Sequence, residues 1–229
     1  MATTVLSDHL WQAEGTALAI KRVALVIAGV AVLAVASKIA FPVPPSPVPV
    51  TLGTFAVLSL GAAYGPRLGL VTILGYMLVG VLGFDVFAKS NTEAFGVFQI
   101  AQSMGIELTA YDTAKSGIAY MMGTTGGYLV GYVLATLALG LAATKGWDRN
   151  PIQMAGAMLI GNALIYVPGL AWLYVLIKGG MFDATKYASE IDQTLVWGLT
   201  PYLIGDAMKL ALAAVLFPLL WKLVGSARA

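Results

Sequence analysis

Asp206 and Lys209 carry opposite charges within a long apolar stretch near the end of the chain, from Leu195 to Val224. A charged side chain at the centre of a bilayer costs about 2.5 to 3.5 kcal/mol on insertion scales, so two of them there indicate a function. Three residues apart, both side chains lie on one face of a helix. They can present a carboxylate acceptor and an ammonium donor to a polar ligand, or they can form a buried ion pair that only satisfies itself.

Other polar side chains fall within or at the start of apolar segments. Asn162 and Tyr166 are four residues apart and share a helix face, while Thr51 and Tyr128 begin two other segments. Each such residue could equally serve helix packing or a membrane interface. Together with the charged pair, they favour a ligand cavity inside a helical bundle.

Several kinds of chemistry are not expected. The sequence has no cysteine, and its one histidine, His9, lies in the polar N-terminal segment, which argues against thiolate or zinc sites and Ser-His catalysis. The stretch Gly123-Thr124-Thr125-Gly126-Gly127 lacks the lysine of a Walker phosphate loop. We therefore expect that the protein is not an enzyme and has no metal site or cofactor.

Composition defines the elements that must position these residues. The 229 residues are 59% hydrophobic and 10% charged, with a mean hydropathy of +0.85, whereas a soluble domain carries about 25% charged residues. A spanning helix needs roughly 20 apolar residues. We predict an all-α integral membrane protein with a single polytopic domain over residues 1–229. Its six transmembrane helices are predicted at residues 23–41, 51–64, 68–84, 126–143, 151–177 and 195–224.

Proline and glycine mark the connections between these helices. Gly65-Pro66-Arg67 predicts a tight turn between the second and third helices. The proline-rich residues 42–50 predict an extended, polyproline-like connection, because proline removes backbone donors. Residues 85–122 form a polar stretch that is long for a connection, and loops of that length are usually functional or disordered.

Basic residues predict the orientation in the membrane. With the N-terminus inside, seven basic residues fall on the cytoplasmic side and five on the outer side, so both termini are expected in the cytoplasm. The inner set is Lys21, Arg22, Arg67, Lys145, Arg149, Lys222 and Arg228, and the outer set is Lys38, Lys89, Lys115, Lys178 and Lys186. The expected location is a bacterial cytoplasmic membrane, and no basic run indicates a nucleic-acid partner.

Five motifs occur in order along the chain. They are Pro47-Val48-Pro49-Val50-Thr51, Gly61-x-x-x-Gly65-Pro66-Arg67-x-Gly69, Gly83-Phe84-Asp85-Val86-Phe87-Ala88, Gly126-Gly127-Tyr128-Leu129-Val130-Gly131-Tyr132 and Gly205-Asp206-x-x-Lys209. Together they resemble the BioY family, the biotin-specific S components of energy-coupling factor transporters. The resemblance covers about residues 23–223. It departs from the family pattern at Gly53, Asp85 and Thr125, and in a longer loop around residues 99–120.

The resemblance implies a six-helix bundle with an outward-facing cavity for biotin. It also implies that Asp206 and Lys209 contact the ureido head, and it makes Asn91 the best match for a loop residue that contacts the biotin carboxylate. Ala24 and Ala28 match the Ala-x-x-x-Ala motif by which the family's first helix docks a membrane-embedded coupling subunit. Two separate ATPase subunits would supply the energy.

Three other functions remain open at the level of sequence. An S component for a different vitamin would keep the bundle and change the cavity. A stand-alone proton-coupled carrier would use Asp206 as a proton relay and would need no ATPase partner. An intramembrane enzyme is the weakest alternative, since no second carboxylate, histidine or serine-base pair accompanies Asp206.

Overall fold

A computed structural model describes residues 4–41, 43–44, 46–88, 117–182 and 185–226. In these ranges, five helical stretches are long and apolar enough to cross a membrane. They are α2 (Gly15–Lys38), α3 (Gly53–Val81), α7 (Gly126–Thr144), α8 (Pro151–Lys178) and the run Glu190–Gly225. The shorter elements are α1 (Leu6–Leu10), β1 (Ala40–Phe41), β2 (Val50–Thr51), α6 (Gly117–Met122) and the 3₁₀ turn η1 (Trp147–Arg149).

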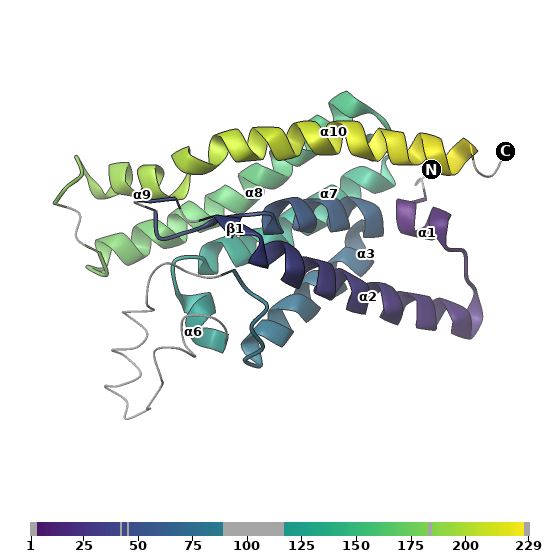
Figure 1. The fold of residues 1–229 in the computed structure, drawn as a ribbon, viewed down its shortest axis with the longest axis horizontal. Coiled ribbons are helices and arrows are strands. Elements are labelled where there is room, and N and C mark those ends of the chain that lie inside the picture. Colours follow the sequence, from purple (N-terminus) through teal and green to yellow (C-terminus); the bar gives the residue numbers. More distant parts are fainter. Residues whose placement is uncertain (1–3, 42, 45, 89–116, 183–184, 227–229) are drawn as a thin grey trace.

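The bundle is built around α7, which packs against α3 on one side and α8 on the other. Helix α2 packs on α3, and α10 (Leu203–Ser226) packs on α8; α2 and α10 lie along opposite edges in Figure 1. Small residues let α7 approach its neighbours closely. A Cβ on Gly131 would lie 2.6 Å from the Ile165 Cα of α8. Any larger residue there would push the two helices apart.

Helix α3 breaks at Gly65, where φ is 76° and ψ is 178°. This left-handed region strongly favours glycine, and Pro66 follows it. A Cβ on Gly69 would lie 3.5 Å from the Gly61 Cα, so the stretches before and after Gly65 fold back against each other. The tight turn predicted at residues 65–67 is therefore present, although helical geometry resumes at once after Gly65.

The first long helix differs from its prediction at both ends. It was predicted over residues 23–41, but α2 runs from Gly15 to Lys38, and Ala40–Phe41 forms strand β1 instead. Strand β1 pairs antiparallel with β2, with Ala40 opposite Thr51 and Phe41 opposite Val50. The pairing joins the two ends of the proline-rich connection. Helix α2 ends early because its chain must turn into this ribbon.

The last helix was predicted to be continuous over residues 195–224, and this prediction is wrong. The structure has α9 (Glu190–Gly198), the 3₁₀ turn η2 (Thr200–Tyr202) and α10 (Leu203–Ser226). Leu199 has φ −129° and ψ −61°, and Pro201 lies in the turn that follows. Proline removes a backbone donor and disfavours helical geometry in the residue before it. The break places the beginning of α10 just before Asp206.

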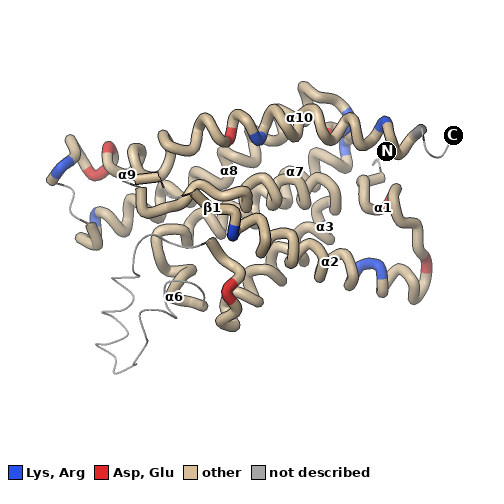
Figure 2. Tube along the Cα trace, in the orientation of Figure 1, with Lys and Arg blue, Asp and Glu red and all other residues tan. Residues whose placement is uncertain are grey.

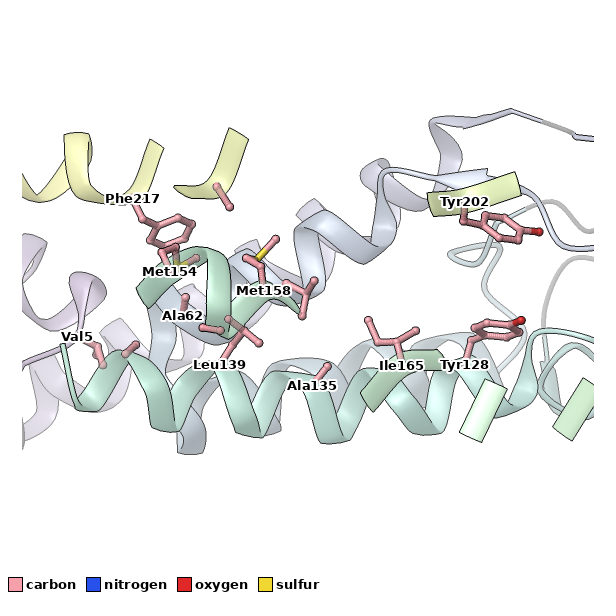
Figure 3. Packing of buried hydrophobic residues seen from close by; sticks show 14 of the residues in the cluster. Val5, Ala62, Tyr128, Ala135, Leu139, Met154, Met158, Ile165, Tyr202 and Phe217 are labelled. Atoms are coloured by element: carbon pink, nitrogen blue, oxygen red, sulfur yellow. The ribbon is translucent and has the colours of Figure 1, made fainter. Parts of the chain in front are cut away.

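The core runs along the length of the bundle (Figure 3). Val5 and Phe217 lie near one end of the displayed cluster, and Tyr128 and Tyr202 lie near the other. Both chain termini lie at the end of the molecule that holds α1 (Figure 1). Charged residues lie mostly toward the two ends of the long axis (Figure 2), as expected where the middle faces lipid.

Candidate ligand-binding site

A cavity lies on the side of the bundle away from Val5 and the chain termini, and its empty space is about 680 Å³, including the part open to the outside. Its walls come from α2, α3, α6, α7, α8, α10 and the two loop segments near residues 48 and 87. The polar lining residues are Ser37, Thr51, Thr54, Tyr76, Tyr120, Thr125, Tyr128, Tyr132, Asn162, Tyr166, Tyr202, Asp206 and Lys209.

The charged pair lies in the wall of this cavity. The Lys209 ammonium donates to Asp206 Oδ1 at 3.1 Å and to Thr54 Oγ1 at 2.9 Å. The Tyr166 hydroxyl donates to Asp206 Oδ2. Asp206 is only 7% exposed and sits in the first turn of α10, where the helix dipole favours a negative charge. Three helices, α3, α8 and α10, therefore hold this polar cluster in place.

Asn162 lies one turn before Tyr166 on the same face of α8 and also lines the cavity. Asn162 is 8% exposed, and within the described part of the chain its side-chain amide makes no hydrogen bond. A buried amide that has two donors and an acceptor is costly to leave unpaired. Asn162 is therefore available to a polar group that enters the cavity.

Aromatic rings form much of the remaining wall. Tyr128 and Tyr166 meet edge to face, with ring centroids 6.4 Å apart, and the Tyr128 hydroxyl donates to the Gly198 carbonyl at 2.9 Å. Phe87 stacks on Tyr120 at 4.6 Å. Burial raises the pKa of Tyr120 to about 12, so its phenol stays protonated at neutral pH. These rings suit the apolar part of a ligand.

The structure brings together six of the seven residues predicted to bind a ligand. Asp206, Lys209, Asn162, Tyr166, Tyr128 and Thr51 all line the one cavity. Asn91 lies outside the described residues. The sequence interpretation missed Ser37, Tyr76, Tyr120, Tyr132 and Tyr202 in the lining. Two of these could have been found by helical spacing, because Tyr132 follows Tyr128 by four residues and Tyr202 precedes Asp206 by four.

The predicted docking residues lie on the outer side of α2. Ala28 is exposed, Ala24 is half-buried, and the neighbouring Ile27 is 65% exposed. The same helix contributes a buried lysine to a second ion pair besides that of Asp206 and Lys209. Lys21 lies within α2, is 2% exposed and pairs with Asp8 at 2.7 Å. The predicted helix began after this residue, so the pair was not seen.

The fold and the cavity define a class: a multi-pass helical membrane protein with a polar-lined cavity within its bundle. The sequence pattern of the BioY family matches residues 11–105 and 92–226. Because these matches cover most of the chain, the protein belongs to the BioY family.

Individual relatives agree with this assignment. The chain is 28% identical over 196 residues to a probable biotin transporter BioY of Pyrococcus horikoshii, covering 86% of this chain and 93% of the relative. It is 28% identical over 174 residues to the biotin transporter BioY of Thermotoga maritima, covering 76% and 81%.

The fold is also similar to a crystal structure of the S component for biotin from an ECF-type ABC transporter. The TM-score is 0.65 at 19% sequence identity, and the match covers 92% of this chain and 95% of that one. At this identity the match supports the shared fold and leaves the ligand contacts to the residues themselves.

Proposed function

We propose that this chain is a biotin-specific S component that binds biotin in the cavity and takes it up across the cytoplasmic membrane. One observation supports the proposal in addition to family membership. A carboxylate, an ammonium and an amide, those of Asp206, Lys209 and Asn162, meet in a cavity with largely aromatic and aliphatic walls. Biotin has the matching chemistry, a compact polar ureido head on an apolar body.

The ureido group has two N–H donors and one carbonyl acceptor. We infer that Asp206 accepts from an N–H group and that Lys209 donates to the carbonyl oxygen, both as charge-assisted hydrogen bonds. The Asp206 oxygens already accept from Tyr166 and Lys209, but each carboxylate oxygen has a second acceptor site. Asn162, Tyr128 and Thr51 are proposed as further contacts, and Asn91 as a contact to the biotin carboxylate.

We propose that the cavity faces outward, with both termini cytoplasmic. Arg149 donates to the Thr4 carbonyl, and Val5 packs at Gly65, so these basic and terminal segments share one end of the bundle. The break at Gly65 would then divide α3 into two membrane segments, which makes six in all. Excess basic charge at that end supports a cytoplasmic location.

Biotin titration of the purified protein tests the proposed ligand. We expect saturable binding of biotin that is displaced by desthiobiotin, which keeps the ureido ring, and is unaffected by vitamins that lack it. Displacement by an unrelated vitamin at comparable concentration would instead indicate an S component for another substrate. Failure of biotin to bind the folded protein would contradict the proposal.

The proposed partners are a membrane-embedded coupling subunit and two ATPase subunits. Ala24→Trp or Ala28→Trp should reduce uptake and association with the coupling subunit, because a large side chain prevents close helix approach. Biotin binding should remain, since neither residue lines the cavity. Uptake that persists without any ATPase and depends on the proton gradient would favour the stand-alone carrier.

A further inference from the structure

The described part of the proline-rich segment, residues 43–44 and 46–50, contributes Val48 and Pro49 to the wall of the cavity. Its prolines have no backbone N–H, so the segment can make few hydrogen bonds of its own. The ribbon of β1 and β2 holds only its two ends. Buried carbonyls between those ends need donors from elsewhere in the protein.

The side chains of Tyr202 and Ser46 supply these donors. The Tyr202 hydroxyl donates to the Val48 carbonyl at 2.5 Å and lies 2.7 Å from Ser46 Oγ. Ser46 Oγ donates to the Trp197 carbonyl at 2.6 Å and accepts from the Val48 N–H at 3.1 Å. Tyr202 and Ser46 are 8% and 3% exposed. The middle of the proline-rich segment is thus fastened to the turn between α9 and α10.

The number of hydroxyl protons in this cluster limits whether Tyr202 can also donate a hydrogen bond to a ligand. Each hydroxyl has one proton, and the acceptors that these two protons share are the carbonyls of Val48 and Trp197 and the two hydroxyl oxygens themselves. The Tyr202 ring lines the cavity, but its hydroxyl has no proton left for a ligand. Tyr202 also precedes Asp206 by four residues. The wall is therefore attached one turn before the carboxylate of the site.

We propose that Tyr202 is a positioning residue whose hydroxyl holds the proline-rich segment against the cavity and thereby slows the escape of bound ligand. The inference rests on the proposed function for the identity of the ligand, biotin. Without the hydroxyl, the Val48 carbonyl loses its nearest donor, and between its ends the segment keeps only the bonds of Ser46, at 2.6 Å to the Trp197 carbonyl and 3.1 Å to the Val48 carbonyl. The wall then opens more often, and ligand leaves through it.

Tyr202→Phe tests this role because it removes the hydroxyl and keeps the ring. We expect biotin to dissociate about tenfold faster, in line with the loss of one buried hydrogen bond, while its association rate changes little. Tyr187→Phe is the matched control. Tyr187 also bonds to Trp197, by accepting from its indole N–H at 2.7 Å, but it does not line the cavity. Its variant should keep the wild-type dissociation rate.

Ser46→Ala should speed dissociation in the same direction, and the Tyr202→Phe, Ser46→Ala double variant should add little to either single change. Residues of one hydrogen-bonded cluster are expected to be non-additive in this way. Fully additive effects on the dissociation rate would mean that the two hydroxyls hold the segment independently and not as one hydrogen-bonded cluster.

Hydrogen exchange without any ligand gives a readout that does not depend on biotin. The amides of Ser46, Val48 and Val50 should exchange faster in Tyr202→Phe than in the wild type or in Tyr187→Phe. If the wild type fails to bind biotin, the proposed function is wrong and this measurement still decides the role of Tyr202. Weaker biotin binding with unchanged exchange would indicate direct contact between the hydroxyl and the ligand, and unchanged binding and exchange would mean no role. Both results overturn the inference.

Discussion

Two clusters of buried charge lie toward opposite ends of the bundle. The cavity cluster contains Asp206 and Lys209, while the terminal cluster contains the pair of Asp8 and Lys21 and, nearby, Asp148. The Lys21 side chain is 2% exposed and that of Lys209 is 13% exposed. By burial alone, the terminal cluster would be the stronger candidate for a functional site.

The surroundings of the two clusters differ. Helix α1 covers the terminal cluster, where Trp221 donates to Asp148 at 2.6 Å and is stacked under the Arg149 guanidinium at 4.1 Å. The cavity cluster instead adjoins open space, which the Asn162 amide also lines. A buried charge marks a binding site only where open space adjoins it. The following predictions are designed to separate the two clusters.

The largest effect is expected at the cavity cluster. Asp206→Asn and Lys209→Met should each weaken biotin binding by about 1.5 to 3 kcal/mol, the value of a hydrogen bond to a charged group. Titration of each folded variant measures this loss. Lys21→Met is the matched control, because it removes an even more deeply buried ammonium that does not line the cavity, and its affinity should equal that of the wild type. Normal binding by both cavity variants would make Asp206 and Lys209 a purely structural pair.

A smaller effect, on stability alone, is expected at the terminal cluster. Asp8→Asn leaves the buried Lys21 ammonium without its anion and should lower the free energy of unfolding by about 1 kcal/mol, since the Asp8 side chain is itself 59% exposed to solvent. Thermal unfolding should show a Tm lower by about 2 to 4 °C. Biotin affinity should stay unchanged, and a loss of affinity would show that the two clusters are coupled.

The smallest effect concerns Asp148, which is 1% exposed. Burial raises the pKa of this carboxyl above its usual 3.8, against the opposing effects of Trp221 and Arg149. The folded protein then binds more protons than the unfolded chain between the two pKa values, so this group makes stability fall as pH rises through that range. Asp148→Asn removes this effect and keeps an acceptor for Trp221.

At pH values well above the folded and unfolded pKa of Asp148, the Asp148→Asn variant should therefore have a Tm about 2 °C higher than that of the wild type. The difference should shrink as the pH approaches 3.8. Melting curves at several pH values measure it. A stabilisation that grows as the pH falls would contradict the assigned direction of the pKa shift.

Hydropathy predicted the helices with the most regular sequences and failed where backbone geometry changes inside an apolar stretch. Helix α7 was predicted over 126–143 and spans Gly126–Thr144, and α8 was predicted over 151–177 and spans Pro151–Lys178. The interruption between α9 and α10 was missed because the residues around Pro201 stay apolar. The β1 to β2 pairing was also missed, since it joins two short segments across the prolines.

The site residues were predictable where a polar side chain stands within an otherwise apolar segment. Asp206, Lys209 and Asn162 stand out in apolar segments, and the structure places all three in one cavity. Tyr76 and Tyr120 also line it, but tyrosine is common at membrane interfaces and gives no local signal. The fastening by Ser46 and Tyr202 joins residues 156 positions apart in the chain. No spacing rule could reveal such a contact.

An experimental structure with biotin bound would test the central claim most directly. The account predicts the ureido head between Asp206 and Lys209, with one N–H group and the carbonyl oxygen each within about 3.2 Å of its partner, and the Tyr202 hydroxyl still bonded to Val48. Biotin bound elsewhere, or bound in this cavity with its ureido head away from Asp206 and Lys209, would contradict it.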